Sequence, residues 1–434
     1  MRPPRIHLGP YEVAGYYAHL ARGFERLGVP CHYGVLIAHP FAFAAVRPKG
    51  LRALALWIDR RRRLLPLRDP RRLAALLLYG LVVAAYGLGT VGRCDTYIFG
   101  FGHSFLPFNL DLPLLRLLGK RVIVNLGHGC EMRLPYCDGS YQSADGLVQP
   151  TAKALAGLTS RRARRARWLE RWAHAVVGAP LSTAPLARQR FVNWFALGVP
   201  CAPQAAEPAG PAESAQPAAM APLRLLHSPS HPALKGTAQI RQAVVALQQQ
   251  GYALEYRELS GCTNAEVLQA LQQCDLLLDQ LYSDTPMAQL ATEAACLGKP
   301  ALVAGYGFDT LRQLVPPDSW PPSLLCRPED LQSTLAEQLR HPQRLRELGA
   351  AAQRFVNQQW APEQVASRFL QLIAAEIPPA WWVDPQAVLY LQGCGQSEAQ
   401  TRRAIRAVIA HGGLAALQLA HRPALQQAMV QFAG

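Results

Sequence analysis

The chain lacks the closely spaced cysteine pairs that characterise a structural zinc site. Its 10 cysteines are scattered over 434 residues, with no Cys-x-x-Cys pair. This pattern argues against both a zinc module and a disulfide framework. We therefore expect reduced thiols, as in a cytoplasmic protein.

Charged residues are also few. They make up 17% of the chain against 50% hydrophobic residues, a balance that excludes an intrinsically disordered protein. Residues 1–8 contain no long apolar run, so we expect no signal peptide. A chain of 434 residues exceeds what one hydrophobic core usually serves, and we expect two or three domains.

Acidic residues are scarce in the first half of the chain. Residues 1–200 carry 28 Lys and Arg against 10 Asp and Glu, a net charge of +18, whereas residues 201–434 carry 16 against 19, or −3. This asymmetry indicates contact with a polyanion, either an anionic membrane surface or nucleic acid. No nucleic-acid-binding motif accompanies the basic residues, so a nucleic acid partner is not expected.

Short apolar segments alternate with helical patterns along most of the chain. Strands are expected at residues 5–9, 94–100, 120–126 and 175–178 and, in a second series, at 223–227, 254–259, 276–278 and 301–304. This alternation predicts mainly parallel sheets of the α/β class, folded as two doubly wound domains. Residues 200–222 are rich in Ala, Pro, Gln and Glu and predict a flexible linker.

The predicted domain organisation has four parts. We expect an N-terminal Rossmann-like domain at residues 1–199, the linker at 200–222, a C-terminal Rossmann-like domain at 223–376 and a helical tail at 377–434. The tail carries no motif that indicates a role, and packing against the domains is the simplest expectation.

Two segments of the first domain are candidates for membrane contact. Residues 73–91 are uncharged and follow a run of arginines, and their length is near the roughly 20 residues of a bilayer span. A buried domain helix, a helix in the membrane interface and a true span all remain open. Residues 160–174 combine arginines with two tryptophans, which indicates either a solvated charged face or an anionic membrane contact. The candidate contact residues are Arg161, Arg162, Arg165, Trp168 and Trp172.

A possible phosphate-binding turn follows the first strand of the second series. Ser228, Ser230 and Lys235 lie in this turn, where hydroxyl donors and one cation can bind a diphosphate. Because a Lys-Gly pair is common, a solvated turn is the alternative.

Two further residues stand out by position. Glu293 lies on a short helix that we expect to begin at Pro286 and to end at Gly298; an exposed, solvated glutamate is the alternative. His128 lies between two glycines directly after the apolar strand at 120–126, which favours a site residue over a core histidine. Gly15 follows the first strand and would let a ligand approach the backbone closely.

These residues carry a resemblance to a known family. The order strand, Pro-Ser-x-x-x-x-Lys-Gly-Thr over 229–237, then Thr-Glu-Ala-x-x-x-Gly-Lys-Pro over 292–300, resembles the nucleotide-sugar half of GT-B-fold glycosyltransferases of the retaining group 1 type. The first half is similar through its glycine-containing loop at Gly15 and the His-Gly-x-Glu-x-Arg turn over 128–133. The likeness covers residues 5–376 in outline.

The resemblance implies a fold, a set of roles and no cofactor. Two Rossmann-like domains would face a cleft, and Lys235 would neutralise the diphosphate of the donor. Glu293 would bind the ribose, and His128 would face the transferred sugar from the opposite domain. Such enzymes usually need no metal.

Other residues match the family less closely. Ser230 stands where the family has an arginine, and Thr285 stands at the first position of its Glu-x7-Glu pair. Asp284, next to Thr285, is the candidate substitute, so the donor-binding set is Gly15, Ser228, Ser230, Asp284 and Thr285. Glu131 and Arg133 are the candidate acceptor-side or supporting residues.

The sequence thus predicts a glycosyltransferase that moves a sugar from a nucleotide-diphosphate donor to a glycan or lipid-linked acceptor, with retention, in cell-surface polysaccharide or glycoconjugate synthesis. We expect it in the cytoplasm, peripheral on the inner face of the plasma membrane. Two alternatives remain. One is a catalytically degenerate GT-B-like protein that binds a nucleotide or glycan as a membrane-associated partner, and the other is a GT-B-fold sugar-nucleotide epimerase.

Overall fold

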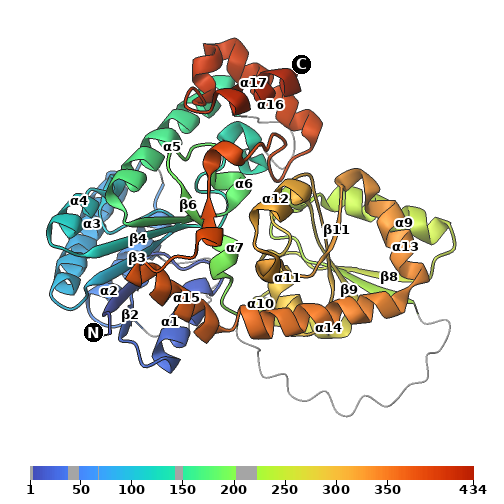
Figure 1. Cartoon of the computed structure of the whole chain (residues 1–434), viewed down its shortest axis with the longest axis horizontal. Coiled ribbons are helices and arrows are strands. Elements are labelled where there is room, and N and C mark those ends of the chain that lie inside the picture. The colour runs from blue at the N-terminus through green and yellow to red at the C-terminus, as the bar shows by residue number, and fades with distance from the viewer. Residues whose placement is uncertain (1–2, 38–47, 67, 142–149, 202–221) are drawn as a thin grey trace. The chain divides into compact units, whose positions relative to one another are not determined.

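The chain folds into two compact units, each built around one sheet (Figure 1). The computed structural model describes residues 3–37, 48–66, 68–141, 150–201 and 222–434, and the predicted linker lies almost wholly outside them. The first unit comprises Met1–Met132, Arg162–Pro200 and Ala361–Pro385. The second unit comprises Arg133–Arg161, Cys201–Trp360 and Gln386–Gly434.

The first unit has a seven-stranded sheet in the order β12-β6-β5-β4-β3-β1-β2. Its strands are β1 (Ile6–Gly9), β2 (Cys31–Tyr33), β3 (Thr96–Gly100), β4 (Arg121–Leu126), β5 (Ala175–Gly178), β6 (Phe191–Asn193) and β12 (Trp382–Val383). All neighbours pair in parallel except β12, which pairs antiparallel with β6. The central strands β3 and β4 are almost fully buried, which explains their near-continuous apolar sequences.

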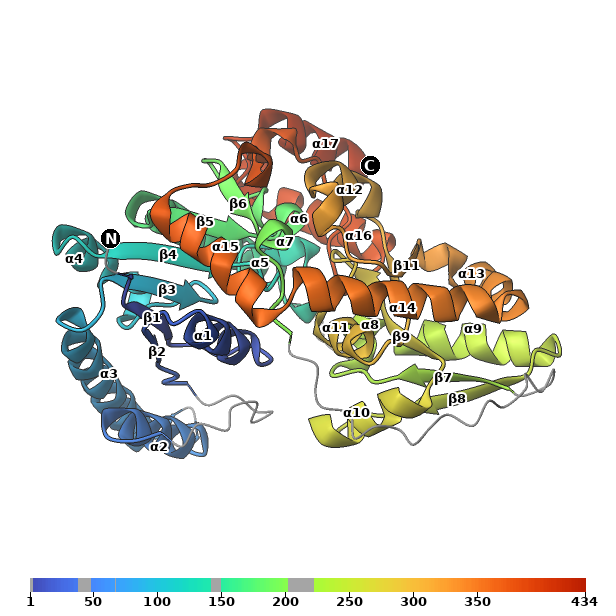
Figure 2. The same cartoon turned by 60° about the horizontal axis from the view of Figure 1, so that its bottom comes forward.

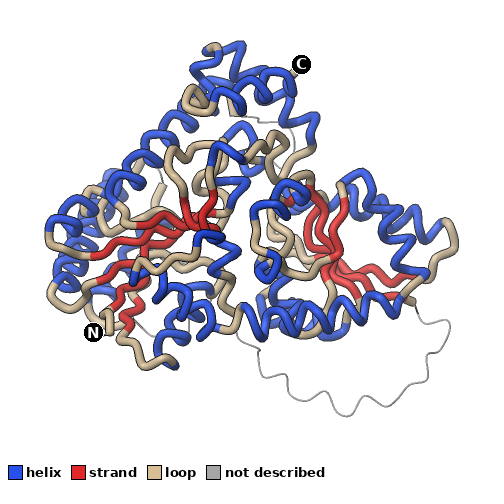
Figure 3. Tube along the Cα trace, in the orientation of Figure 1, coloured by secondary structure: helices blue, strands red, loops and turns tan. Residues whose placement is uncertain are grey.

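Helices cover this sheet, as Figure 3 shows in blue around the red strands. They are α1 (Tyr16–Arg26), α2 (Leu51–Arg63), α3 (Pro70–Val91), α4 (Leu112–Leu117), α6 (Pro180–Thr183), α7 (Trp194–Leu197), α15 (Pro362–Ala374) and the second part of α5 (Ala152–Trp172). The amphipathic spacing of α1 buries Tyr16, Leu20 and Phe24 on one face. Asp69 caps α3 by accepting a hydrogen bond from the Arg71 N–H at 2.8 Å.

The second unit has a five-stranded parallel sheet in the order β11-β10-β9-β7-β8. Its strands are β7 (Leu223–His227), β8 (Leu254–Glu258), β9 (Leu276–Ser283), β10 (Ala301–Gly305) and β11 (Leu324–Cys326). Its helices are α8 (Pro232–Lys235), α9 (Thr237–Gln249), α10 (Asn264–Gln273), α11 (Gln289–Cys296), α12 (Phe308–Leu314), α13 (Leu331–Arg340), α14 (Pro342–Gln359), α16 (Glu398–Gly412) and α17 (Pro423–Ala433). Aliphatic side chains of β7, β9 and β10 form its core with α9 and α13.

The predicted α/β class with two doubly wound sheets is confirmed, but the units are discontinuous in sequence. Within the first unit, α15 lies beside α1 (Figures 1 and 2), and a β-carbon on Gly23 would lie 2.1 Å from the Pro362 carbonyl oxygen. Arg26 also pairs with Glu363 at 2.6 Å. The predicted domains are continuous ranges of the sequence, so they did not place α15 in the first unit. In the sequence, α15 follows all the strands of the second unit.

The end of the chain is likewise integrated rather than a separate tail. Within the second unit, the Tyr136 hydroxyl donates to the Leu417 carbonyl oxygen at 3.0 Å, and the Gly139 N–H donates to the Cys394 carbonyl oxygen at 2.8 Å. Residues 133–161, predicted as part of the first domain, therefore pack with residues 386–434 in the second unit.

One cysteine pair departs from the expected reduced thiols. Cys201 and Cys296 form a disulfide within the second unit, across a sequence separation of 95 residues. The spacing of the cysteines did not reveal this pair, because Cys201 and Cys296 are distant in the sequence and only the fold brings Cys201 next to α11.

The helix α3 is more exposed than a core helix. It is long and apolar enough to cross a membrane, yet only 28% of its most apolar window is buried. Leu73, Leu77 and Leu81 are 60%, 63% and 69% exposed. The alternative of a helix buried in its domain is therefore wrong for most of α3.

Candidate functional site

The second sheet changes winding direction between β7 and β9. The chain leaves β7 for β8 on one side and later places β9 on the other side. Loops after two such strands diverge, and the crevice between them, at the carboxyl ends of the strands, is where open α/β sheets bind ligands. Lys235 follows β7, and Thr285 follows β9, so the predicted donor residues lie at this switch point.

Lys235 is held over the end of β9. Its ammonium donates to the Gln280 side-chain oxygen at 2.6 Å and lies 3.9 Å from an Asp279 carboxylate oxygen. The next residue, Gly236, has φ +71, and a β-carbon there would lie 2.5 Å from the Leu281 β-carbon. Only glycine therefore allows α8 to pass into α9 this close to β9.

The histidine at the end of β7 fixes the same loop. His227 bonds through Nδ1 to the Leu278 carbonyl oxygen at 2.7 Å and through Nε2 to the Thr237 hydroxyl at 2.8 Å. Because a carbonyl oxygen only accepts, Nδ1 carries the proton and Nε2 accepts from Thr237. Burial lowers the pKa of His227, which keeps this neutral arrangement. The start of α9 is thereby tied to β7 and β9.

Sequence reasoning missed Asp279 and Gln280. Asp279 is 1% exposed, and its second carboxylate oxygen has no hydrogen-bond partner in the described part of the chain. Gln280 also donates to the Ser283 hydroxyl at 2.8 Å. The signal was present, because an adjacent acid and amide interrupt the otherwise apolar strand at residues 276–283. Because buried polar atoms normally have a hydrogen-bond partner, the remaining Asp279 oxygen is open to a ligand.

Glu293 lies on α11 beside this group. Its carboxylate accepts a hydrogen bond from Gln289 at 3.2 Å. Burial raises the pKa of Glu293 to about 7; the Gln289 bond opposes this shift and the Asp279 charge adds to it. Asp279 therefore acts electrostatically on both Lys235 and Glu293, and Glu293 is a carboxyl with a pKa near neutral pH.

The remaining donor candidates occupy two loops. Ser228 is partly buried and Ser230 is exposed, both between β7 and α8. Thr285 belongs to a turn built on Ser283, whose hydroxyl accepts from the Thr285 N–H at 3.1 Å and donates to the Thr285 carbonyl oxygen at 2.7 Å. Pro286 lies in this turn and does not begin the helix, which starts at Gln289. The Ser283 hydroxyl stabilises this turn, so the helix begins at Gln289 and not at the predicted Pro286.

Asp284 has a different partner from the one expected. Arg133 donates to one Asp284 oxygen at 3.0 Å from Nε and at 2.6 Å from Nη2, and both side chains are buried. Arg133 also lies 3.7 Å from Asp138. Asp284 is thus engaged inside the second unit, and the expectations of Asp284 as a donor ligand and of Arg133 as an acceptor-side residue do not fit these contacts. Nothing in the local sequence pairs two residues 151 positions apart.

The first sheet has its own switch point, between β1 and β3. The loops after these strands bring together aromatic rings: Tyr11 lies 5.5 Å from Phe101 and 5.0 Å from His103, measured between ring centroids. His128 follows the next strand, β4, and its ring centroid lies 6.5 Å from that of Phe101. An aromatic surface therefore lines the carboxyl ends of this sheet.

His128 lies where the sequence predicts it and is neutral. Its Nε2 is 3.2 Å from the Tyr17 hydroxyl, and its ring meets the Tyr16 ring edge-on at 5.0 Å. Burial lowers the pKa of His128 to about 3. The imidazole can therefore exchange hydrogen bonds with a ligand without carrying charge.

The neutrality of His128 predicts a pH dependence of stability. Unfolded histidine takes up a proton near pH 6.5, whereas the folded ring resists protonation down to about 3. The unfolded state binds more protons in this window, so the free energy of unfolding falls as the pH drops below 6.5. We expect His128 to account for at most about 2 kcal/mol of that loss by pH 5.

Urea unfolding of the wild type and of His128→Asn at pH 7.5 and 5.0 measures this contribution. The wild type should lose more stability than the variant over this interval. Equal losses in the two proteins, or an imidazole NMR signal that titrates near pH 6.5, would contradict the assignment.

The amino-terminal turn of α1 is already occupied. The Glu12 carboxylate accepts from the backbone N–H groups of Val13 at 2.8 Å, Tyr17 at 3.2 Å and Ala18 at 2.9 Å. Gly15, with φ +83, lets the chain turn into the helix. Gly15 is therefore a turn residue, and the Glu12 carboxylate already accepts from the backbone N–H groups near it. This differs from our expectation that a ligand would approach the backbone at Gly15.

Glu131 and Arg165 of the basic helix α5 belong to the first unit. Glu131 is 4% exposed. Burial lowers the pKa of Arg165, and the Glu131 charge opposes that shift. Arg165 donates from Nη2 to the Phe101 carbonyl oxygen at 2.8 Å and from Nε to the Gly102 carbonyl oxygen at 3.1 Å. These bonds remove Arg165 from the candidate membrane contacts.

The other candidates on α5 divide by exposure. Arg161 is exposed and Arg162 is partly buried. The Trp168 indole N–H donates to the Asn109 carbonyl oxygen at 2.9 Å, and the Trp168 and Trp172 rings lie 5.8 Å apart. Both tryptophans are partly buried. The two rings therefore pack within the protein, and the exposed face of α5 is mainly arginine.

Comparison with known proteins gives distant structural likenesses. The sequence matches no protein-family model and no curated protein. The structure is similar to Anabaena Alr3699/HepE in complex with UDP-glucose, at 12% identity over 85% of this chain and 99% of that chain, with a TM-score of 0.46. It is also similar to the spinosyn rhamnosyltransferase SpnG, at 14% identity over 85% and 100%, with a TM-score of 0.41. The glycosyltransferase SnogD from Streptomyces nogalater shares 14% identity over 85% and 98%, with a TM-score of 0.38. Likenesses of this degree assign neither a family nor an activity.

Proposed function

We propose that the chain is a glycosyltransferase that binds a nucleotide-diphosphate sugar at the β7–β9 switch point. One observation carries the proposal: the ammonium of Lys235 lies at this crevice, 3.9 Å from the buried carboxylate of Asp279, and the charge of Asp279 in turn acts on Glu293 of α11. A departing diphosphate needs a fixed cation, and a ribose offers hydroxyl groups that a carboxyl group can bind. The three side chains supply both requirements.

The amino terminus of α9 adds to the site for the diphosphate. Its capping residue, Gly236, is in the left-handed conformation, and no described side chain caps this helix. Backbone N–H groups at a helix terminus favour an anion, and Lys235 lies directly before them. Because lysine and helix terminus together supply positive charge, the proposal requires no metal ion.

Glu293 serves as the ribose ligand in this scheme. A carboxyl with a pKa near 7 can accept from one hydroxyl and, when protonated, donate to another. Gln289, four residues earlier, orients it through their shared hydrogen bond. Ser228 and Ser230, in the same loop region as Lys235, are the proposed additional donors to phosphate oxygens.

The first unit supplies the proposed sugar and acceptor contacts. His128 is neutral and bonded to Tyr17, so it can orient a sugar hydroxyl without altering the charge at the reaction centre. The net charge of +18 over residues 1–200 supports an acceptor held at an anionic surface. We extend the proposal to a glycan or lipid-linked acceptor at the cytoplasmic face of the plasma membrane, and to transfer with retention in polysaccharide or glycoconjugate synthesis.

A screen of UDP-, GDP- and ADP-sugars tests the proposal directly. The purified chain is mixed with each donor, binding is measured by calorimetry, and released nucleoside diphosphate is quantified with and without glycan acceptors. At least one donor should bind and turn over. Absence of both binding and turnover across the panel would overturn the nucleotide-sugar assignment.

A second candidate function follows from the Arg133–Asp284 pair. Because Asp284 is engaged by Arg133 and Thr285 lies in a hydrogen-bonded turn, neither stands free to assist the donor sugar. The chain would then be a binding protein that acts as a membrane-associated partner. Donor binding without turnover over the whole panel would favour this function.

A further inference from the structure

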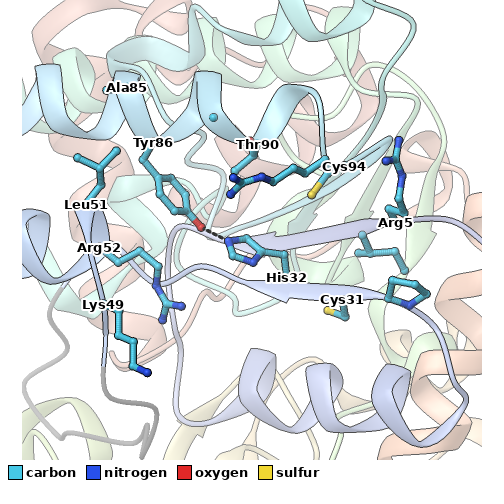
Figure 4. Close-up of a pocket in the computed structure, with 14 residues that line it drawn as sticks. Arg5, Cys31, His32, Lys49, Leu51, Arg52, Ala85, Tyr86, Thr90 and Cys94 are labelled. Atoms are coloured by element: carbon cyan, nitrogen blue, oxygen red, sulfur yellow. Dashed lines mark hydrogen bonds between the residues drawn. The ribbon is translucent and has the colours of Figure 1, made fainter.

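A cavity lies at the amino-terminal ends of β1 and β2, the end of the first sheet opposite to the aromatic surface described above. It has a volume of about 820 Å³ and is bounded by the start of α2 and the last turns of α3 (Figure 4). The Tyr86 hydroxyl projects into it from α3 and lies 2.9 Å from Nε2 of His32 on β2. The candidate sugar and nucleotide residues follow the carboxyl ends of strands, so this cavity is a separate site.

The lining of the cavity is strongly cationic. Its basic residues are Arg5, Lys49, Arg52 and Arg93, and no acidic residue is among the described residues that line it. Arg5 pairs with Asp95 at 3.3 Å. The Nε of Arg52 is buried without a hydrogen-bond partner in the described part of the chain. The sequence offers no nearby counter-ion, because no Asp or Glu occurs between Glu25 and Asp59.

The helices that border this cavity expose an unusual amount of apolar surface. On α2 and in the turn after it, the exposed side chains are Leu51, Leu54, Trp57 and Leu64; on α3 they are Leu73, Leu76, Leu77, Leu78, Leu81 and Leu88. We call this set the α2–α3 apolar face. The two helices pack side by side (Figure 2). Ten large exposed apolar side chains on two packed helices and the turn after the first favour contact with a partner or a membrane.

Positive charge lies at both ends of the α2–α3 apolar face. The far end, where α2 turns into α3, carries the exposed arginines Arg60, Arg61, Arg63, Arg68 and Arg71. The near end carries the cationic cavity. A helix of 22 residues such as α3 is about 33 Å long, so two basic groups flank an apolar strip of that length. Apolar side chains between cations match the interface of an anionic bilayer.

The packing of α3 excludes a membrane span. Val82, Val83 and Gly87 in its second half are buried within the first unit, and a β-carbon on Gly87 would lie 2.9 Å from the Phe105 ring. The side of α3 that carries these residues packs on an α/β unit whose loops and sheet edges cannot enter the hydrocarbon region of a bilayer. The helix can therefore offer the bilayer only its outward side, in the plane of the interface.

We propose that the cavity between α2, α3 and β2 binds the phosphate headgroup of an anionic phospholipid, while the α2–α3 apolar face lies in the acyl boundary of the same bilayer. Guanidinium groups suit a phosphate diester because they donate in a planar fork. Arg52, with its unpaired Nε, is the principal ligand, and Lys49 and Arg93 complete the charge.

Of the two segments that the sequence offered for membrane contact, the proposal favours residues 73–91, which lie in α3, over the basic helix α5, and it adds α2. It does not require glycosyl transfer, because vesicle binding is measured without a donor. A negative donor screen would therefore not contradict the lipid proposal. Likewise, absence of vesicle binding would not contradict the proposed donor site.

Co-sedimentation of the full chain with vesicles tests the proposal. One set of vesicles is pure phosphatidylcholine, and the other contains added phosphatidylglycerol. We expect partition onto the anionic vesicles to exceed partition onto the neutral ones by at least about tenfold at low salt, and to decrease as salt is added. Equal partition onto the two sets would overturn the headgroup site.

Two variants separate the headgroup from the apolar contribution. Lys49→Gln/Arg52→Gln should lower partition onto anionic vesicles by about thirtyfold and leave neutral vesicles unaffected. Leu77→Ser/Leu81→Ser should lower partition onto both sets by at least about tenfold. All four side chains are partly or fully exposed, and unchanged thermal unfolding would confirm that the variants fold.

Matched controls come from the second unit. Arg257→Gln/Arg354→Gln removes two exposed charges, and Val245→Ser/Leu414→Ser removes two exposed apolar side chains. These controls should bind as the wild type does, and losses equal to those of the test variants would overturn the proposal. A second copy of the chain is the other possible occupant of the apolar face. If the wild type sediments as a dimer that Leu77→Ser/Leu81→Ser converts to a monomer, and does not bind vesicles, the lipid assignment is wrong.

Discussion

Lys235→Ala is expected to lower kcat for sugar transfer by about 10²- to 10³-fold, the usual loss when one preorganised group that stabilises leaving-group charge is removed. The ammonium is fixed by Gln280 and lies close to Asp279, so it needs little reorganisation to meet a diphosphate. Its charge matters most when the bond to the sugar breaks and the diphosphate gains negative charge. The larger effect should therefore appear in kcat rather than in KM.

The measurement is steady-state release of nucleoside diphosphate with the donor that the screen identifies. Lys299→Ala is the matched control, because Lys299 donates to the Cys274 carbonyl oxygen before β9 begins and is distant from the strand ends that hold the site. That variant should keep turnover within about threefold of the wild type. Equal losses in the two variants would indicate damage to the fold, and no loss in Lys235→Ala would reject the role of the lysine.

Arg133→Met is expected to lower the free energy of unfolding by about 3–5 kcal/mol, because it leaves the buried carboxylate of Asp284 without its cation. Arg133 and Asp284 are about 10% and 8% exposed, so water cannot replace the lost bonds. For domains of this size, 1 kcal/mol corresponds to a Tm change of about 2–4 °C. Calorimetry should therefore show a Tm about 6–20 °C below that of the wild type.

The double variant Arg133→Met/Asp284→Leu separates a structural ion pair from a ligand-binding one. With both charges removed, much of the lost stability should return, since replacing a whole buried pair by apolar side chains is often neutral. Asp138, the second partner of Arg133, retains the Ser140 hydroxyl at 2.7 Å. An exposed pair is the control: Arg241→Met should leave the Tm nearly unchanged. A double variant as unstable as the single one would contradict this explanation.

The sequence predicted the sheets, and it made Lys235 and Glu293 site candidates, because both predictions depend on local patterns. Buried parallel strands are continuous apolar runs, and Lys235 and Glu293 each stand next to a glycine-marked turn or helix end. The same reliance on local patterns explains why Asp279 was missed. Strand residues in a sheet covered on both faces show no alternation, so the pattern does not reveal which polar side chain points toward a ligand.

Long-range contacts account for the other differences. Asp284 was assigned to the donor from its place beside Thr285, but its partner Arg133 comes from a segment that the sequence places in the other domain. Gly15 was assigned to a ligand because glycine allows close approach, and the Glu12 carboxylate takes that position instead. In both cases a charged side chain of the chain itself fills a place where a motif suggests a ligand.

The discontinuity of the two units has a consequence for synthesis of the protein. Their boundaries, after residues 132, 161, 200, 360 and 385, send the chain from one unit to the other five times. No continuous gene fragment therefore encodes one complete unit without also encoding parts of the other. During translation, the first sheet cannot gain its last strand until β12 has left the ribosome, after every strand of the second sheet has been synthesised. Nascent chains would thus keep the edge of β6 unpaired from the synthesis of residue 193 until that of residue 382, and premature termination before residue 382 would leave that edge permanently unpaired.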